Sequence, residues 1–192
     1  MRLRDILFGV LMLVPCVQAG AQGGPDDFAR VVANFPIEQA AGKRVKFSGY
    51  IKTDSITKLR VRVSTGETAE VNGYAGLWWR ADRGEQVAAF DNMAGRGPGG
   101  TSDWRRYEVS LSIPSDITNI NFGLLQVGPG TAWFADLKIE IDKKPFVSEE
   151  FDLNLSASPP QGFTTRGANY EFVADPTQTF QGKPSLRIRR IR

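Results

Sequence analysis

The fold is decided by the stretch Gly73-Tyr-Ala-Gly-Leu-Trp-Trp-Arg80. Aromatic and aliphatic residues alternate in it with small or polar ones. The pattern continues in Ala89-Phe-Asp-Asn-Met93 and in Ser102-Asp-Trp-Arg-Arg-Tyr-Glu-Val109, with a glycine-rich loop over 93–102 between them. Such alternation, broken by turn residues, is typical of half-buried antiparallel strands. It also places aromatic, acidic and amide side chains near strand ends, where a sandwich presents ligands.

Similar short runs recur through the rest of the chain. The expected strands are 29–35, 44–53, 59–63, 74–81, 86–91, 105–113, 117–126, 131–141, 151–155, 169–173 and 185–191. Helical periodicity is scarce, and only 26–34 is ambiguous between helix and strand. The sequence therefore predicts an all-β protein, a two-sheet antiparallel sandwich. Residues 142–149 read as a polar linker.

The first residues have the pattern of a secretory signal peptide. Arg2 and Arg4 precede an apolar run from Ile6 to Val14, and small residues near Ala21 suit cleavage there. We expect a signal over 1–21, a single domain over 22–192, and a secreted or periplasmic location. Cys16 leaves a lipid anchor as an alternative, although Pro15 fits one poorly. The apolar run is too short to span a bilayer, and we expect no membrane span elsewhere.

Composition excludes several kinds of chemistry. The chain has no His, which rules out a Ser-His-Asp triad and His-based metal sites. Cleavage would remove the lone Cys and lower the net charge from +3 to +2, a weak surplus, so we expect no nucleic-acid partner. Paired carboxylates remain, but nothing in the spacing sets any two of them opposite each other. We therefore expect no enzymatic activity. The carboxylates considered are Asp54, Asp82, Asp91, Asp103 and Glu108.

Five blocks resemble a known module. They are Lys43–Thr53, Ala75–Arg80, Ala89–Met93, Gly100–Val109 and Thr131–Ile139. In order and spacing they look like the galactose-binding-domain-like, or carbohydrate-binding-module, jelly rolls of exported bacterial proteins. The resemblance covers most of 28–141 and implies a jelly roll there. It implies ligand binding by analogy only, since such folds host many functions.

The order of the blocks departs from that module. Segments like 169–175 and 182–188 come first in the module and last here. One reading is a circularly permuted jelly roll, in which 150–191 supply strands that complete the sheets and hide their edges. Another is a truncated second copy of the module. A third is a strand-swapped homodimer, with 142–149 as the hinge.

Tryptophans are candidate stacking platforms for a sugar. Trp78 and Trp79 are adjacent in a strand, so they point to opposite faces and one of them belongs to the core. Trp133 lies in an apolar strand, and we expect it in the core. Trp104 begins a strand after the glycine-rich loop, where we favour a core position over the alternative of a ligand contact.

Polar candidates surround the same region. Arg80, Asp91 and Asn92 could hydrogen-bond sugar hydroxyls beside the mobile loop. The structural reading of Asp91 and Asn92 is that they cap a turn through the backbone. The resemblance also implies a structural calcium, and Asp136 matches one acidic ligand position. The acidic partner beside it is Ala135 here, so we expect neither a metal nor another cofactor.

The sequence thus favours an exported, non-catalytic binding module. Its expected ligand is a carbohydrate or a cell-envelope glycan, bound by Trp78 or Trp79 with Arg80, Asp91, Asn92 and Trp104. The alternative is a protein–protein or assembly module that pairs a sheet face or the C-terminal strands with an envelope protein.

Overall fold

The computed structural model describes residues 28–62 and 67–191, so the predicted signal peptide lies outside the described residues. Strands dominate the description. They are β1 (Phe28–Asn34), β2 (Arg44–Ile56), β3 (Leu59–Arg62), β4 (Thr68–Val71), β5 (Tyr74–Arg83), β6 (Gln86–Asp91), β7 (Gly100–Ser112), β8 (Asn119–Val127), β9 (Thr131–Ile141), β10 (Lys144–Phe146), β11 (Thr164–Arg166), β12 (Tyr170–Phe180) and β13 (Lys183–Arg190). One short helix, α1 (Ile37–Ala40), is described among them.

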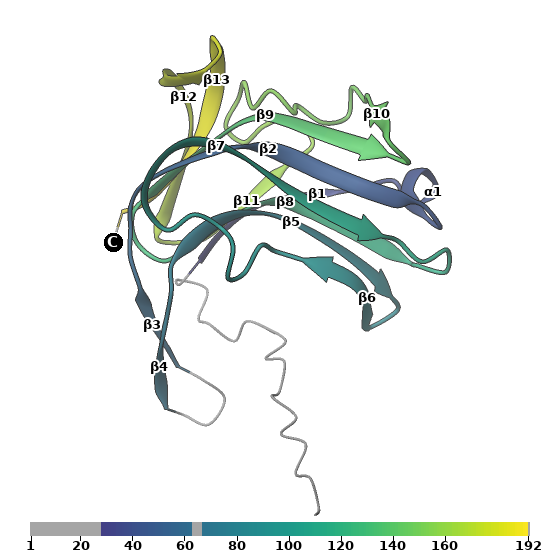
Figure 1. Cartoon of the computed structure of the whole chain (residues 1–192), viewed down its shortest axis with the longest axis horizontal. Helices are drawn as coiled ribbons and strands as arrows, with labels where there is room; N and C mark the ends of the chain where they lie inside the picture. Colours follow the sequence, from purple (N-terminus) through teal and green to yellow (C-terminus); the bar gives the residue numbers. More distant parts are fainter. Residues whose placement is uncertain (1–27, 63–66, 192) are drawn as a thin grey trace, which may run out of the picture.

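The strands form two stacked layers (Figure 1). One sheet has the order β11-β1-β8-β5-β6, and the other has the order β12-β13-β9-β2-β7 with β10 beside β9. All their pairings are antiparallel. The β3–β4 hairpin projects away from the two layers (Figure 1). The predicted all-β, two-sheet antiparallel sandwich is confirmed.

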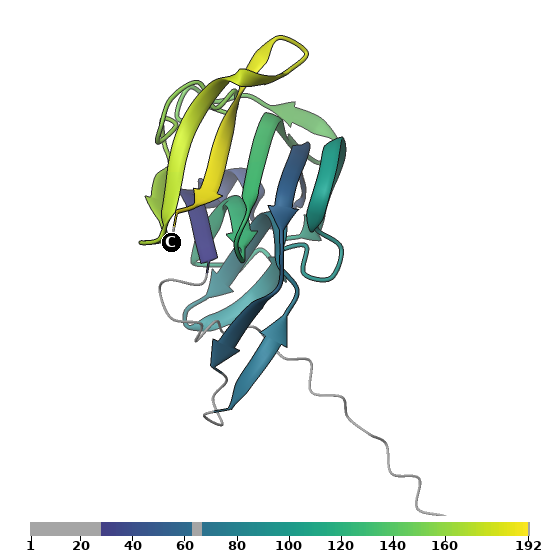
Figure 2. The ribbon, with the colours of Figure 1, turned by 90° about the vertical axis from the view of Figure 1, so that its left-hand side faces the viewer.

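The C-terminal strands enter both sheets. β13 pairs with β9, with Leu186 opposite Phe134, and β11 pairs with β1 on the other layer. Figure 2 shows β12 and β13, in yellow, running alongside β9. Strands from both ends of the described chain therefore share the two sheets. Circular permutation would explain why the sequence blocks stand in this order along the chain, and it stays a prediction.

The segment over 142–149 is not a simple linker. Ile141 pairs with Lys144, so β9 and β10 form a hairpin with a two-residue turn. Asp142 and Lys143 both have positive φ, 49° and 68°, as the twist-matched hairpin turn requires. The Asp142 carboxylate also accepts a hydrogen bond from the Arg44 backbone N–H at 2.9 Å. The sequence hides this turn because it contains Asp-Lys where Asn-Gly is usual.

Two other segments differ from expectation or resolve an ambiguity. Phe151 to Leu155 is not a strand: the Asp152 carboxylate accepts hydrogen bonds from the backbone N–H groups of Asn154 and Ser156 and forms a turn. Phe151 and Leu155 are nevertheless buried in the core. The ambiguous N-terminal segment is strand β1, in which every second side chain is buried.

The core between the layers is aromatic. The Trp79 ring lies 5.1 Å from the Phe122 ring and 4.8 Å from the Phe35 ring, between centroids. Phe47 of the other sheet meets Phe122 edge-on at 5.4 Å. Such offset or edge contacts add about 0.5–1.5 kcal/mol per pair to the burial of apolar area. Phe151 also contacts Phe122 edge-on, so the segment after β10 packs on the same core.

Truncating Leu186 tests whether the C-terminal strands share this core. Leu186 is fully buried on β13, so Leu186→Ala should lower the free energy of unfolding by about 2–5 kcal/mol. Unfolding should stay a single transition in urea, followed by tryptophan fluorescence. The control Ile191→Ala lies on the same segment at 52% exposure and should change the free energy by less than about 0.5 kcal/mol. A separate early transition in the Leu186 variant would contradict a shared core.

Candidate functional site

The outer face of the six-stranded sheet carries an aromatic cluster. Tyr50 of β2 stacks on Phe180 of β12, with 3.8 Å between ring centroids. Trp104 of β7 lies 5.7 Å from the same Phe180 ring. Trp104 is half-buried on this outer face, so the expectation that it belongs to the core is wrong. Three strands far apart in the chain thus bring aromatic rings to one surface.

Trp133 belongs to the same outer face, and the expectation that it is a core residue is wrong. Its neighbours Ala132 and Phe134 in β9 are fully buried, so the intervening side chain points away from the core. Trp133 is half-buried there. Its indole Nε1 donates a hydrogen bond to the Asp175 carboxylate at 3.0 Å. That bond satisfies the polar end of the ring on a partly wet surface.

A hollow of about 360 Å³ lies beside Trp133. We call it the Trp133 hollow. Its lining includes Lys52, Asp54, Thr101, Asp103, Trp133 and Gln178. It therefore combines one indole with carboxylate, amide, hydroxyl and ammonium groups from β2, β7, β9 and β12.

Some polar groups in the hollow are already partnered. Thr101 donates a hydrogen bond to Asp54 at 3.2 Å, and Lys52 lies 3.6 Å from the Asp103 carboxylate. Asp54 and Asp103 are exposed, so their remaining oxygen lone pairs face solvent. The side-chain amide of Gln178 has no hydrogen-bond partner within the described residues. These groups are available to a ligand that offers both donors and acceptors.

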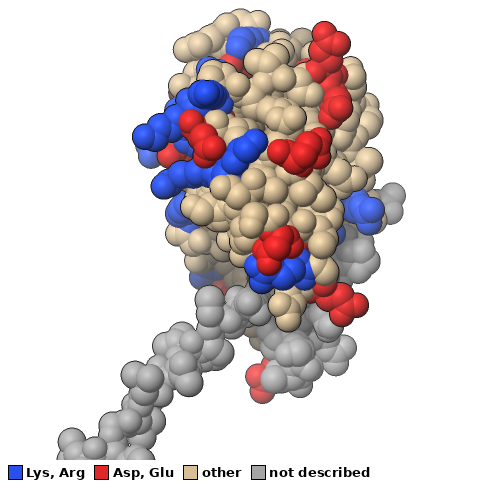
Figure 3. Space-filling model, turned by 90° about the vertical axis from the view of Figure 1, so that its right-hand side faces the viewer, with Lys and Arg blue, Asp and Glu red and all other residues tan. Residues whose placement is uncertain are grey.

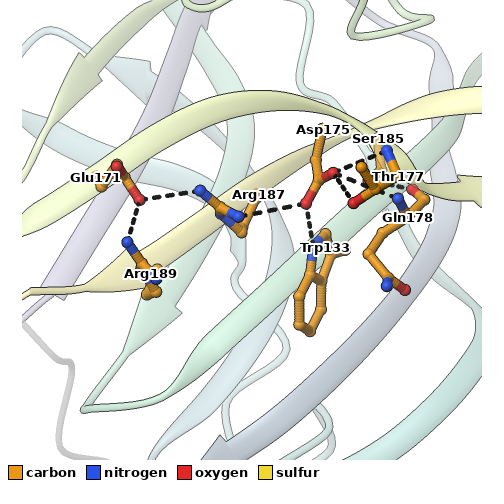
Figure 4. A network of polar contacts seen from close by, with 8 residues as sticks. All are labelled: Trp133, Glu171, Asp175, Thr177, Gln178, Ser185, Arg187 and Arg189. Atoms are coloured by element: carbon orange, nitrogen blue, oxygen red, sulfur yellow. Dashed lines mark hydrogen bonds and ion pairs between the residues drawn. The ribbon is translucent and has the colours of Figure 1, made fainter.

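A buried carboxylate holds one wall of the hollow in place (Figure 4). Asp175 is 5% exposed and accepts hydrogen bonds from the Thr177 N–H at 2.9 Å, the Thr177 hydroxyl at 2.6 Å and the Gln178 N–H at 3.3 Å. With the bond from Trp133, it ties the turn after Asp175 to the indole. In Figure 4 the side chains of Trp133 and Gln178 extend in the same direction from this network.

One arginine contacts the same carboxylate, and Glu171 links that arginine to a second one. Arg187 lies 3.5 Å from Asp175 and 3.1 Å from Glu171, and Arg189 lies 2.9 Å from Glu171 (Figure 4). Burial raises the pKa of Asp175, but hydrogen bonds from Thr177 and Trp133 outweigh it and hold that pKa below its ordinary value. Asp175 is therefore ionised at neutral pH and acts as a fixed acceptor.

Trp78 and Trp79 lie on opposite faces of β5. Trp79 is fully buried among Phe35, Phe47 and Phe122, so no ligand can reach its ring, and it leaves the set of ligand candidates. Trp78 lies on the outer face of the five-stranded sheet, where its Nε1 donates to the Leu124 carbonyl at 3.2 Å. It is only 7% exposed, so it cannot offer an open stacking platform.

Asp91 and Asn92 act as turn residues. The Asp91 carboxylate accepts a hydrogen bond from the Met93 N–H and a forked ion pair from Arg96, and Asn92 accepts from the Ala94 N–H. These bonds anchor the glycine-rich loop against Tyr74, and burial, with the Asp91 charge, raises the pKa of Tyr74 to about 12. The structural reading of both residues therefore fits the observed contacts. Neither lines the Trp133 hollow.

Asp136 does not fit a calcium ligand. Its two carboxylate oxygens contact ammonium groups, Lys183 at 2.5 Å and Lys138 at 2.9 Å. Burial raises the pKa of Asp136, but the two lysines lower it further than burial raises it. Among the described residues, no group of three acidic, His or Cys side chains could hold a metal ion.

Arg80 and Trp78 meet at a second hollow, on the outer face of the five-stranded sheet. Arg80 is bound there to Asp82 at 2.7 Å. Sequence reasoning missed three residues that line or support the two hollows: Gln178 and Arg166 in the linings, and Asp175 behind Trp133. The run Asp175-Pro-Thr-Gln178 does carry a turn signal, because Asp bonds readily to backbone N–H groups two residues on. Nothing in the sequence connects that turn with Trp133.

Comparisons with known proteins give one sequence likeness. The chain is 31% identical over 115 residues to the uncharacterized HTH-type transcriptional regulator YbfP of Bacillus subtilis (strain 168). The match covers 59% of this chain and 34% of that protein, so the chain spans about a third of the relative's length. No family model matches the chain, and no solved structure matches it.

The described residues do not contain the helices that a helix-turn-helix needs. A helix-turn-helix needs two packed helices, whereas the parts of the chain described here contain α1 alone, of four residues. For the same reason, no helix in these parts is long or apolar enough to cross a membrane.

Replacing Asp175 tests the wall of the Trp133 hollow. At pH 7, Asp175→Asn should be less stable to urea than the wild type by about 1–3 kcal/mol, because a buried hydrogen-bond network loses its charged acceptor. The lowered pKa means that ionised Asp175 stabilises the fold above the ordinary carboxyl pKa of about 3.9. That contribution is lost as the pH falls through the lower folded-state pKa.

The difference between wild type and Asp175→Asn should therefore shrink between pH 7 and pH 3. Trp133 emission should also change in the variant at pH 7, because the indole loses its charged acceptor. An equal stability difference at both pH values would contradict this account of the network.

Proposed function

We propose that this protein is an exported, non-catalytic carbohydrate-binding module of the jelly-roll kind, with the Trp133 hollow as its ligand site. The observation that carries the proposal is the Trp133 hollow itself, with its half-exposed indole and the amide of Gln178, which has no partner among the described residues. The ligand class is a carbohydrate or cell-envelope glycan, met in the periplasm or outside the cell.

The chemistry of the hollow suits a neutral sugar. The apolar C–H face of a pyranose stacks on an aromatic ring, while its hydroxyls both donate and accept hydrogen bonds. Asp54 and Asp103 offer acceptors, and Lys52 and Gln178 offer donors. The volume of about 360 Å³ falls at the low end of the range of roughly 300–1,000 Å³ for ligand pockets, which fits a short saccharide.

The wall of the hollow is preorganised. Asp175 fixes the Trp133 ring and the Gln178 backbone before any ligand arrives. Ordering a rotamer-rich side chain on binding costs about 0.5–1.5 kcal/mol, so a wall that is already fixed retains more of the contact energy as affinity. A fixed wall of this kind supports a role for Trp133 in ligand binding, beyond the exposure of its ring on the surface.

Two features support a role without catalysis. Asp54 and Asp103 border the same hollow, but both are exposed, whereas the acid of a glycosidase is usually set in an apolar pocket. The chain also has no His for acid–base work. The 31% identity over 115 residues to part of a protein named as a transcriptional regulator fits a ligand-binding unit carried by different proteins.

The charge distribution on one face of the molecule bears on nucleic-acid binding. On the face drawn in Figure 3, basic side chains have acidic ones close by, and a wide area carries neither charge. Nucleic-acid binding commonly requires a basic stripe or patch, and the face drawn in Figure 3 does not carry one.

The alternative function is a protein–protein or assembly module, and one observation favours it. β6 is an edge strand of the five-stranded sheet, and its Val87 and Phe90 are 46% and 43% exposed. An exposed apolar edge can add a strand from a partner. In that case the protein would purify with an envelope partner, or as a homodimer in which β12 and β13 are exchanged, and would bind no glycan.

A glycan array followed by calorimetry tests the carbohydrate proposal. Gln178→Ala removes one hydrogen-bonding amide without touching the core, and we expect it to weaken the best array ligand at least tenfold, or about 1.4 kcal/mol. Trp133→Ala should abolish binding, because the stacking surface is lost. Phe90→Ala, an exposed aromatic on the other sheet, is the matched control and should bind as the wild type does.

Circular dichroism melting of the same variants separates lost binding from lost folding. The proposal is wrong if the array shows no glycan, or if Phe90→Ala loses as much affinity as Gln178→Ala. A co-purifying partner together with a silent array would favour the assembly module.

A further inference from the structure

The second hollow gathers arginines on the outer face of the five-stranded sheet. It has a volume of about 250 Å³, and its lining includes Arg30, Trp78, Arg80, Asp82, Asn121 and Arg166. We call it the arginine hollow. It lies on the opposite layer from the Trp133 hollow, so an inference about it does not rest on the proposed function.

Two of these arginines face each other with no counter-ion. Arg30 of β1 and Arg166 of β11 are direct cross-strand partners in the register. Like charges in this position destabilise a strand pair. Within residues 28–62 and 67–191, neither guanidinium takes part in an ion pair. The fold therefore keeps a repulsive pair that a bound anion would relieve.

The third arginine, Arg80, has its own counter-ion, Asp82, and this carboxylate does not pair with Arg30 or Arg166. Arg80 Nε lies 2.7 Å from the Asp82 carboxylate, and Asp82 also accepts a hydrogen bond from the Asn119 amide at 3.3 Å. Arg80 and Asp82 thus neutralise each other. The net charge left at the hollow comes from Arg30 and Arg166 and is that of two guanidinium groups.

Arg30 is the more constrained of the pair. Its Nε is buried and has no hydrogen-bond partner among the residues that the structure describes, and its guanidinium lies 4.8 Å from the centre of the Phe28 ring. Burial lowers the pKa of Arg30, and the charge of Arg166 lowers it further. An unpartnered buried donor of this kind is costly in the absence of an acceptor.

Two lining residues of the hollow, Val32 and Trp78, lie on either side of a glycine of β8. Gly123 of β8 lies between Val32 and Trp78 in the register and contributes no side chain. A Cβ at Gly123 would lie 1.8 Å from the Val31 carbonyl oxygen, so no other residue fits there. The Trp78 indole is fixed by its bond to Leu124. The side-chain amide of Asn121 has no hydrogen-bond partner in the described parts of the chain and adds a neutral polar group.

We propose that the arginine hollow binds a doubly charged oxyanion, the phosphate monoester of a small polar molecule. Two unpaired guanidinium forks match the charge and the oxygen geometry of a phosphate group. A phosphate monoester carries about two negative charges above its second pKa of about 6. Asn121 lines the same hollow and is placed to contact the polar group that the phosphate esterifies.

Calorimetry with four small molecules tests the inference on the full chain. Glucose 6-phosphate should bind, and glucose should not, because it lacks the anion. Glucuronate, a monocarboxylate, should bind at least tenfold more weakly because it compensates only one charge. Inorganic phosphate should bind more weakly than glucose 6-phosphate, since it makes no contact beyond the anion. The affinity for glucose 6-phosphate should rise between pH 5 and pH 7, as the monoester gains its second charge.

Three variants assign the binding to this hollow. Arg166→Gln and Arg30→Gln should each lower the affinity for glucose 6-phosphate at least tenfold. Arg166 is exposed, so Arg166→Gln should keep the fold and should melt at or above the wild-type temperature, because the repulsion is relieved. Arg189→Gln, at an arginine of the other sheet that is paired with Glu171, is the control and should leave the affinity for glucose 6-phosphate unchanged.

Gln178→Ala separates the two sites, since it should leave phosphate binding intact whether or not the carbohydrate proposal holds. The inference is overturned if none of the molecules binds, or if Arg166→Gln binds glucose 6-phosphate as tightly as the wild type. Equal affinity for glucuronate and glucose 6-phosphate would contradict the claim that the ligand carries two negative charges. Equal affinity for inorganic phosphate and glucose 6-phosphate would contradict the claim that the ligand is an ester and would leave free phosphate as the ligand.

Discussion

The pairing of β13 with β9 is the interaction on which the rest of the structure depends. It places Leu186 and Ile188 in the core between the layers and adds the β12–β13 hairpin to the six-stranded sheet. Through that hairpin, Asp175 reaches the Trp133 indole, and Phe180 reaches Tyr50. Without this pairing, the edge of β9 would be open, the core would lose one wall, and the Trp133 hollow would lack its amide and its carboxylate support.

Both proposed sites follow from the same constraint. A two-layer sandwich uses the inner faces of its sheets for the core, so ligand chemistry is left to the outer faces. Each outer face is completed by the C-terminal segment: β12 supplies Gln178 to the Trp133 hollow, and β11 supplies Arg166 to the arginine hollow. The two faces then differ in charge. One combines indole, carboxylates and amide, and the other has two guanidinium groups that form no ion pair within the described parts of the chain. The differences in chemistry suit a neutral saccharide on one face and a phosphate ester on the other.

The sequence carried the strand pattern but not the partners of its side chains. Alternation along Tyr74 to Arg80 was enough to predict a strand with Trp78 and Trp79 on opposite faces, because strand geometry is local. The hairpin turn at Asp142 and Lys143 was not predicted, because positive φ at two non-glycine residues leaves no clear signal in the sequence. Trp133 read as core because an apolar ring in an apolar strand does not reveal an acceptor 42 residues away. The opposition of Arg30 and Arg166 depends on the register of two distant strands, which composition and spacing do not encode.

Hydrogen–deuterium exchange on the β13 and β9 peptides tests the central pairing most directly. If the C-terminal hairpin belongs to the sandwich, amides of Leu186, Ile188 and Phe134 should exchange with the same slow rate as those of β2, because they open only with the whole domain. Rapid exchange over 183–190, beside full protection of β2 and β9, would show that the hairpin is not part of the cooperative core. That result would contradict the account of the fold and of both sites.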